Sequence, residues 1–311
     1  MADLKAWNAW HGCKKYSAGC ANCYMYALDK MHNVPERSFV VKKTNSFNLP
    51  LSKNRHRQYK IPAGFILRVN MSSDTFIEEA DQWRDEMWEI IKKRCDVIFY
   101  ILTKRVDRIQ QCLPDDWNDG YENVVLNITC ENQKLFNQRW EIFKDIPAKH
   151  KGIHLSPLLS AIDIKPALSS QQLDSVFCEG ENYGGNRSRP CYYDWLKQIS
   201  DDCRQYKVNF VFHSTGEFFI KDNKKYRIKK EIQSEQAYLS KLSCFFEKPK
   251  YKLYDSYDGH LLSDEELMQP TYNEYRCLTC SQVEFCSGCQ NCGICSQIHL
   301  VDYQQLMQLR Q

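Results

Sequence analysis

The feature that most constrains the fold of this chain is a regular alternation of two sequence patterns between residues 64 and 215. Six short runs rich in β-branched and aromatic residues alternate with stretches in which apolar residues recur every three or four positions. The runs are FILRVN (65–70), VIFYILT (97–103), NVVLNIT (123–129), GIHLSPL (152–158), SVFCEG (175–180) and NFVFHST (209–215). They lack strict polar–apolar alternation, as expected of parallel strands whose two faces are both covered.

Strand–helix alternation at this spacing predicts an α/β fold with right-handed crossovers. Six strands, with a seventh expected before Cys13, favour a full or partial (βα) TIM-like barrel. A doubly wound open sheet is the alternative. We assign residues 1–220 to the barrel domain. Residues 221–311 are expected to form a charged connector and a small, cysteine-rich, metal-binding extension.

Five of the expected strands end in polar residues. These ends are NMSSD (70–74), TKR (103–105), TCENQ (129–133), EGEN (179–182) and HSTGE (213–217). A single polar loop after a strand is ordinary, but ligand groups of (βα) barrels collect at the carboxyl ends of the strands. Five polar strand ends in succession therefore predict one cavity that is lined by these polar residues.

The sixteen cysteines among 311 residues can be interpreted only once their compartment is considered. The first ten residues contain no signal-peptide core, and the longest apolar runs are far too short to span a bilayer. We therefore expect a cytoplasmic protein without a membrane partner, whose cysteines are thiols or metal ligands rather than disulfides. No Gly-rich phosphate loop, HExxH helix or serine-nucleophile elbow is present, which disfavours kinases and hydrolases.

The opening segment WHGCKKYSAGCANCYMY (10–26) contains Cys13, Cys20 and Cys23 in the spacing C-x6-C-x2-C. Three thiolates can hold three irons of a [4Fe-4S] cluster and leave the fourth iron open to S-adenosylmethionine. A structural zinc site needs four ligands, and His11 could supply the fourth. The motif thus predicts either an open iron–sulfur cluster or a closed Cys3His zinc site.

A second cysteine cluster lies near the end of the chain. It consists of Cys277, Cys280, Cys286, Cys289, Cys292 and Cys295. Pairs of the form C-x2-C can hold a tetrahedral zinc, whereas cysteines at every third position are typical of iron–sulfur ligation. We expect a metal site here, either a second iron–sulfur cluster or zinc.

The pattern W-x2-W-H-G-C-x6-C-x2-C-Y resembles the opening signature of a phage-associated family of three-cysteine-motif proteins. That family is similar to radical S-adenosylmethionine (radical SAM) enzymes. Other segments resemble it in the same order along the chain, so the resemblance covers about residues 7–220. The matching segments are FNLPL, FILRVNMSSDTF, IFYILTKRVDRI, NVVLNITCENQ, HLSPLLSAID and CEGENYGGNRSRPCYYDWLKQISDDC.

The resemblance implies a barrel enzyme in which Cys13, Cys20 and Cys23 hold a [4Fe-4S] cluster. Reduced by an electron donor, the cluster would cleave S-adenosylmethionine to a 5′-deoxyadenosyl radical that acts on an unknown substrate. The implied cofactor contacts are Asn70, Ser72 and Ser73 to the methionine part, Thr129, Glu131 and Asn132 to the ribose, and Glu181.

The sequence also differs from the patterns of the resembling proteins at three places. The first cysteine gap is six residues instead of the commoner three. Asn22 replaces the aromatic residue usually placed before the third cysteine, and Tyr24 follows that cysteine instead. The segment 213–216, His-Ser-Thr-Gly, stands where the family more often has Lys-Gln-Trp-Gly. The substrate of this protein therefore need not be that of its relatives.

The segment 37–73 contains no acidic residue and interleaves aromatic with basic side chains. We name Lys53, Arg55, Arg57 and Lys60 as candidate contacts to a nucleic-acid backbone. Basic loops with aromatic residues suit phosphates and stacked bases, although a solvated basic loop has the same composition. A nucleic acid is therefore our first expectation for the substrate, with a peptide or small metabolite as alternatives. The competing hypothesis for the whole chain is a non-catalytic zinc protein that binds nucleic acid.

Overall fold

The computed structural model describes residues 6–247 and 249–267, which cluster into two compact units. Unit 1 comprises residues 6–129, 137–152 and 249–267, and unit 2 comprises residues 130–136 and 153–247. The strands are β1 (Ala6–Trp7), β2 (Trp10–His11), β3 (Lys42–Lys43), β4 (Ile66–Val69), β5 (Ile98–Thr103), β6 (Val124–Thr129), β7 (His150–Leu155), β8 (Ser175–Glu179), β9 (Cys191–Tyr192), β10 (Asn209–Ser214), β11 (Phe218–Lys221) and β12 (Lys224–Arg227).

The α-helices are α1 (Tyr24–Met31), α2 (Asp81–Lys93), α3 (Ile109–Cys112), α4 (Gln133–Phe143), α5 (Lys165–Leu168), α6 (Tyr193–Tyr206) and α7 (Lys230–Leu239). Short 3-10 helices span Ala18–Cys20, Pro35–Phe39, Leu49–Leu51, Glu78–Ala80, Val106–Arg108 and Gly185–Arg187. In the part of the chain described, no helix has the length and apolar character needed to cross a bilayer.

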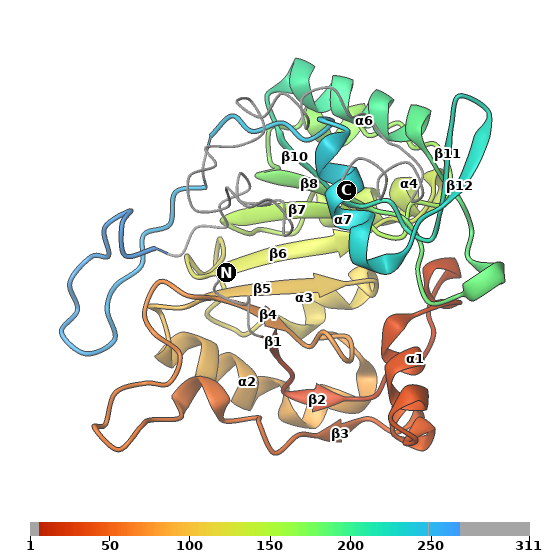
Figure 1. The fold of residues 1–311 in the computed structure, drawn as a ribbon. Coiled ribbons are helices and arrows are strands. Elements are labelled where there is room, and N and C mark those ends of the chain that lie inside the picture. Colours follow the sequence, from red (N-terminus) through yellow and green to blue (C-terminus); the bar gives the residue numbers. More distant parts are fainter. Residues whose placement is uncertain (1–5, 248, 268–311) are drawn as a thin grey trace, which may run out of the picture. The chain divides into compact units, whose positions relative to one another are not determined.

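Seven strands form one parallel sheet in the order β1-β4-β5-β6-β7-β8-β10 (Figure 1). The order follows the chain without reversal, whereas a doubly wound sheet would reverse at a switch point. The sheet curls into a half-barrel, so the prediction of a partial TIM-like barrel is confirmed. Each of the six predicted strand runs overlaps one strand, and the expected seventh strand is β1.

In unit 1, an apolar cluster closes the amino ends of the strands. It consists of Ile66, Ile98, Val125, Leu253, Leu262 and Leu267, all buried. Ile66 and Ile98 are the first residues of β4 and β5, so the segment from Leu253 to Leu267 packs at that end. The carboxyl ends of the same strands carry polar residues instead, and the cysteine loop is attached there.

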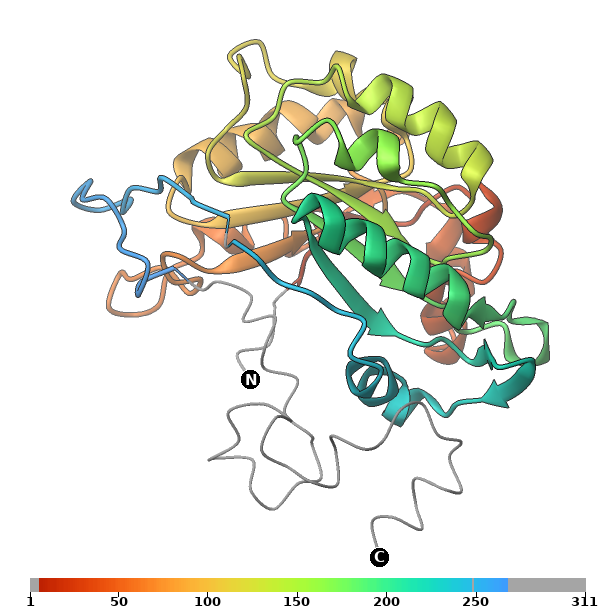
Figure 2. The same ribbon diagram turned by 90° about the horizontal axis from the view of Figure 1, so that it is seen from above.

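In unit 2, β8 and β10 pair in parallel, and the register shifts between Phe212 and Ser214. The thiol of Cys178 lies within electrostatic range of Cys203 on α6, so Cys178 faces that helix. Figure 2 shows α6, in green, along one face of these strands. Because side chains alternate along a strand, Phe177 and Glu179 point to the opposite face.

A smaller sheet in unit 2 has the order β12-β11-β9. The strands β11 and β12 are antiparallel and form a hairpin (Figure 1). Its two turn residues, Asp222 and Asn223, have φ values of 50° and 60°. Positive φ at both central residues is the signature of a type I′ turn, whose twist matches that of the flanking strands. The hairpin therefore has a well-defined register.

Candidate metal centre

The loop that carries the three cysteines begins at a glycine that no other residue can replace without strain. Gly12 has φ +94°, and a Cβ built there would lie 2.5 Å from the carbonyl oxygen of Val40. Its N–H donates to the Ser72 carbonyl (3.1 Å), and the N–H of Cys13 donates to the Ser38 carbonyl (2.9 Å). These contacts attach the loop to the segment that follows β4 and to the 3-10 helix Pro35–Phe39.

The other two cysteines lie at helix termini. Cys20 ends the 3-10 helix Ala18–Cys20, and its sulfur accepts the backbone N–H of Tyr16 at 3.5 Å. Cys23 is the N-cap of α1. The N–H groups of Met25 and Tyr26 lower the pKa of Cys23, although burial has the larger effect and raises it. The amino end of a helix favours negative charge, so this position suits a thiolate.

The three sulfurs lie within electrostatic range of one another. Burial is the main cause that raises the pKa of Cys13 to about 12, followed by Asp74, while Cys20 and Cys23 add to the rise. All three thiols also raise the pKa of Tyr26, whose hydroxyl donates to the Cys13 carbonyl. The sequence thus brings its three cysteines to one place, beside the ring of Tyr26.

His11 is engaged by a carboxylate. Its Nε2 lies 2.8 Å from Oδ2 of Asp29, the same oxygen that accepts the hydroxyl of Ser38 at 2.6 Å. Within the described residues, the thiols and His11 do not form a group whose ligand atoms all lie within 4.8 Å of one another. One zinc ion with bonds of about 2.0–2.3 Å needs that convergence, whereas a cluster bonds each thiolate to a different iron.

Two cations from the loop after β5 face the thiols. Nη1 of Arg105 lies 3.9 Å from Sγ of Cys13, and Lys104 lowers the pKa of Cys23. Asp74 lies 3.4 Å from the Arg105 guanidinium. Its side chain also accepts hydrogen bonds from the Thr103 hydroxyl (2.7 Å), the Lys104 N–H (3.0 Å) and the Phe76 N–H (3.0 Å). Positive charge beside thiolates stabilises them and any anionic cluster that they hold.

The polar strand ends TKR and NMSSD predicted a cavity, but nothing in their pattern singled out Lys104, Arg105 or Asp74. The available signal was a pair of adjacent cations directly after a strand. Tyr16 was also missed: its hydroxyl donates to Asp107 (2.6 Å), and its ring lies 5.0 Å from the Arg105 guanidinium. Tyr16 is exposed, and its ring covers one side of the Arg105 guanidinium.

The implied cofactor residues of unit 1 divide into two kinds. The side chain of Asn70, which has φ +52°, accepts the N–H of Ala9 (2.8 Å) and donates to Thr75 (3.2 Å). The hydroxyl of Ser73 donates to the carbonyl of Gly12. Both side chains therefore brace the backbone around the cysteine loop.

The hydroxyl oxygens of Ser72 and Thr129 are different. Both atoms are buried, and neither has a hydrogen-bond partner among the described residues. A buried polar atom without a partner costs free energy unless a ligand or water satisfies it. Of the implied cofactor residues in unit 1, these two retain hydrogen-bonding capacity for a polar molecule.

The remaining implied residues lie in unit 2. Glu181 accepts the backbone N–H and the Nε–H of Arg189, both at 2.8 Å. The fully buried Glu131 also raises the pKa of Arg189. The side chain of Asn132 accepts the N–H of Leu135 (3.0 Å) at the start of α4. Two of the three thus share one guanidinium, and the third caps a helix.

His213 stands at the register shift of β10, where a bulge redirects a side chain. Its Nε2 lies 3.6 Å from Oε1 of Glu179, and its ring is 5.2 Å from that of Phe177. The Phe177 ring stacks on His154 at 4.6 Å. The segment that departs from the resembling family therefore carries a partly exposed imidazole beside a carboxylate.

The four candidate nucleic-acid contacts, Lys53, Arg55, Arg57 and Lys60, are all exposed in unit 1. The aromatic residue among them is occupied, because the Tyr59 ring lies 4.0 Å from Arg94 and 4.5 Å from Lys53. It also packs against Tyr257, whose hydroxyl accepts the N–H of Tyr59 at 2.8 Å. The charged side chains of this loop are therefore exposed, but the ring of Tyr59 already packs against other residues of the chain.

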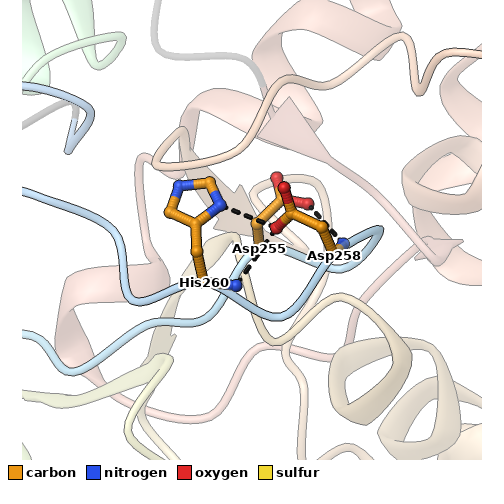
Figure 3. A group of neighbouring side chains, drawn as sticks. All are labelled: Asp255, Asp258 and His260. Atoms are coloured by element: carbon orange, nitrogen blue, oxygen red, sulfur yellow. Dashed lines mark hydrogen bonds and ion pairs between the residues drawn. The ribbon is translucent and has the colours of Figure 1, made fainter.

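Near Tyr257, the side chains of Asp255, Asp258 and His260 approach one another closely enough to hold a cation (Figure 3). Asp255 accepts the N–H of Tyr257 (2.7 Å), and Asp258 accepts Nδ1 and the backbone N–H of His260. Nε2 of His260 lies 3.1 Å from Glu266. Hydrogen bonds of an exposed turn account for this group. The C-terminal cysteines 277–295 lie outside the described residues.

A protein-family profile matches residues 3–249 and is described as "Protein of unknown function (DUF5131)". The chain belongs to the DUF5131 family. Neither the search of curated proteins nor the search of solved structures gave a significant match. The family description names no activity, so the links to radical SAM enzymes and to phages remain predictions. The DUF5131 match includes the opening motif and excludes the C-terminal cysteines.

Proposed function

We propose that this DUF5131 protein is a radical SAM enzyme whose [4Fe-4S] cluster is held by Cys13, Cys20 and Cys23. The observation that carries the proposal is the grouping of three thiols beside Lys104 and Arg105. A trio of thiolates leaves one iron without a protein ligand, and the neighbouring cations compensate the negative charge. A partial barrel is a suitable scaffold because its strand ends converge on such a loop.

When bound, the cluster would supply the electron that cleaves S-adenosylmethionine into methionine and a 5′-deoxyadenosyl radical. The protein contributes orientation and exclusion of water. Of the implied cofactor residues in unit 1, Ser72 and Thr129 have hydroxyls with spare capacity for a polar cofactor. Arg105, oriented by Asp74, holds positive charge at Cys13.

The test is anaerobic purification with reconstitution, followed by iron and sulfide analysis and an electronic spectrum. We expect a brown protein with about four irons at the opening motif, which releases 5′-deoxyadenosine and methionine when reduced with dithionite. Alanine substitution of the three cysteines should abolish this release and leave any C-terminal metal in place. A colourless protein that contains only zinc after reconstitution would refute the proposal.

The second candidate is a non-catalytic zinc protein that binds nucleic acid. It is favoured by a strongly basic segment, residues 221–230, which contains six lysines and arginines and one aspartate. This candidate predicts zinc at the opening motif, with His11 released from Asp29, and no cleavage of S-adenosylmethionine. The same metal analysis distinguishes the two functions.

A further inference from the structure

We propose that the β11–β12 hairpin of unit 2, together with the ring of Tyr192 beside it, binds a single strand of nucleic acid. The inference does not depend on the proposed radical SAM activity, because the surface contains no cysteine of either cluster. It gives the nucleic-acid binding of the second candidate a defined surface and a defined ligand class. It also differs from the loop 53–60 that the sequence pattern favoured.

The hairpin concentrates positive charge. Its cations are Lys221, Lys224, Lys225 and Arg227, and Lys229 and Lys230 follow directly. All except Lys221 are exposed. The acidic residues nearby are fewer. Asp222 lies 3.7 Å from Lys221, Glu217 lies 3.1 Å from Arg227, and Glu231 follows Lys230 in the first turn of α7. The segment thus presents a net positive surface, to which a polyanion would be attracted.

Two features of this surface disfavour the folded state. Lys221 and Lys224 are directly opposite each other in the hairpin register, and like charges at such positions repel. Lys229 and Lys230 stand at the amino end of α7, where the helix dipole is already positive. Lys230 lies over the ring of Tyr183 at 4.1 Å and Lys224 over that of Tyr226 at 5.0 Å, so aromatic rings of the chain hold part of this charge. The opposed lysines of the hairpin and the two lysines at the helix end are nevertheless positions where an anionic partner would lower the electrostatic free energy.

The spacing suits a nucleic-acid backbone. Lys225 and Arg227 are two residues apart on β12, so they share one face of the strand and lie about 7 Å apart. That separation is of the same order as the distance between successive phosphates of an extended strand. The Phe218 ring supports both cations, with Lys225 at 4.1 Å and Arg227 at 5.8 Å from its centroid. The charges are therefore held at the surface.

Aromatic rings adjoin the cations. Tyr192 on β9 is the register partner of Ile220 on β11, and Ile220 is that of Lys225. These three side chains therefore share one face of the small sheet. The ring of the half-buried Tyr192 packs against that of Trp195, with a centroid distance of 4.3 Å and a tilt of 31°. A ring in this setting can stack an unpaired base, which is why we specify a single strand rather than a duplex.

The experiment measures the fluorescence anisotropy of a labelled 20-nucleotide DNA strand of mixed sequence with the full-length protein at several salt concentrations. Binding should weaken steeply with salt. In the variant K224Q/K225Q/R227Q, the slope of log K against log salt should fall by about 2, since each single-strand phosphate contact contributes about 0.7. The variant Y192A should lose about tenfold in affinity with the slope unchanged.

The matched control is K92Q/K144Q/K149Q, which removes the same charge from lysines of unit 1 that are ion-paired with acidic residues. It should leave the slope unchanged. Equal losses in both triple variants would mean that only net charge matters and would overturn the proposal. So would a loss confined to R55Q/R57Q/K60Q, or tighter binding to the matched duplex. Binding to phosphatidylglycerol vesicles but not to the oligonucleotide would also overturn it. Circular dichroism and melting curves verify that each variant is folded.

Discussion

The cysteine loop of unit 1 and the β11–β12 hairpin of unit 2 both combine cations with aromatic rings, but they differ in burial. In the loop, Arg105 is almost wholly buried and lies between Asp74 and the sulfur of Cys13. In the hairpin, Lys224 and Lys225 are exposed. A buried cation has to be compensated by a nearby fixed anion, whereas exposed cations can meet an extended partner from solution. Burial therefore separates the proposed cluster site from the proposed nucleic-acid surface.

The largest expected effect concerns the backbone of the cysteine loop. Gly12→Ala forces a Cβ to within 2.5 Å of the Val40 carbonyl at a φ of +94°. We expect unfolding to become easier by about 4 kcal/mol or more, together with loss of iron retention. Gly185→Ala is the control, because Gly185 has φ +56° but no atom within 4 Å of its Cβ position. That control should cost only about 1–2 kcal/mol. Chemical denaturation curves of the two variants provide the measurement.

The next effect tests the buried cation. Arg105→Gln leaves Asp74 buried without its guanidinium partner, and we expect a loss of about 3 kcal/mol in stability and weaker cluster retention. In the double variant R105Q/D74N no unpaired buried charge remains, so stability should recover in part. Recovery is partial because the introduced amide nitrogen cannot accept the Lys104 N–H. Iron retention should not recover, because the cation beside Cys13 is still missing. Recovery of both properties would show that Arg105 is purely structural.

The pH dependence of folding stability tests the effect of burial on a lysine that lies outside both regions. Burial lowers the pKa of Lys151 from 10.5 to about 8, and its Nζ donates to the carbonyl of Phe143 at 3.1 Å. Between these two pH values the unfolded chain binds more protons than the folded one. Stability should therefore rise as pH increases from about 8 to 10.5. In Lys151→Met this rise should be absent. Denaturant midpoints of the two proteins over pH 7–10.5 test the prediction, and identical profiles would contradict it.

The smallest expected effect separates stability from binding in the hairpin. Lys224→Glu turns the like-charge pair with Lys221 into an attractive pair, so stability should rise by roughly 0.5 kcal/mol. Nucleic-acid binding should weaken at the same time. Lys225→Glu is the control, because Lys225 stands opposite Ile220 and its reversal gains no such pair. It should weaken binding without the gain in stability. Thermal melts and anisotropy on the same preparations compare the two.

Much of the fold could be predicted from the sequence because strand and helix periodicity depend on local burial. The runs 97–103 and 123–129 contain β5 and β6 because β-branched and aromatic residues dominate them. The partial barrel was among the expected architectures. The degree of closure was not predictable, since it depends on how edge strands such as β1 and β10 are covered in three dimensions.

By itself, the sequence determined the α/β alternation, the position of the strand ends and the unusual count of three cysteines in the opening motif. These are properties of neighbouring residues, and local chemistry is sufficient to read them. Only the tertiary structure decided that His11 turns to Asp29, that Arg105 reaches Cys13, and that Arg94 covers the ring of Tyr59. Each of these contacts joins residues well separated in sequence. Their partners are chosen by packing, which no spacing rule within a motif specifies.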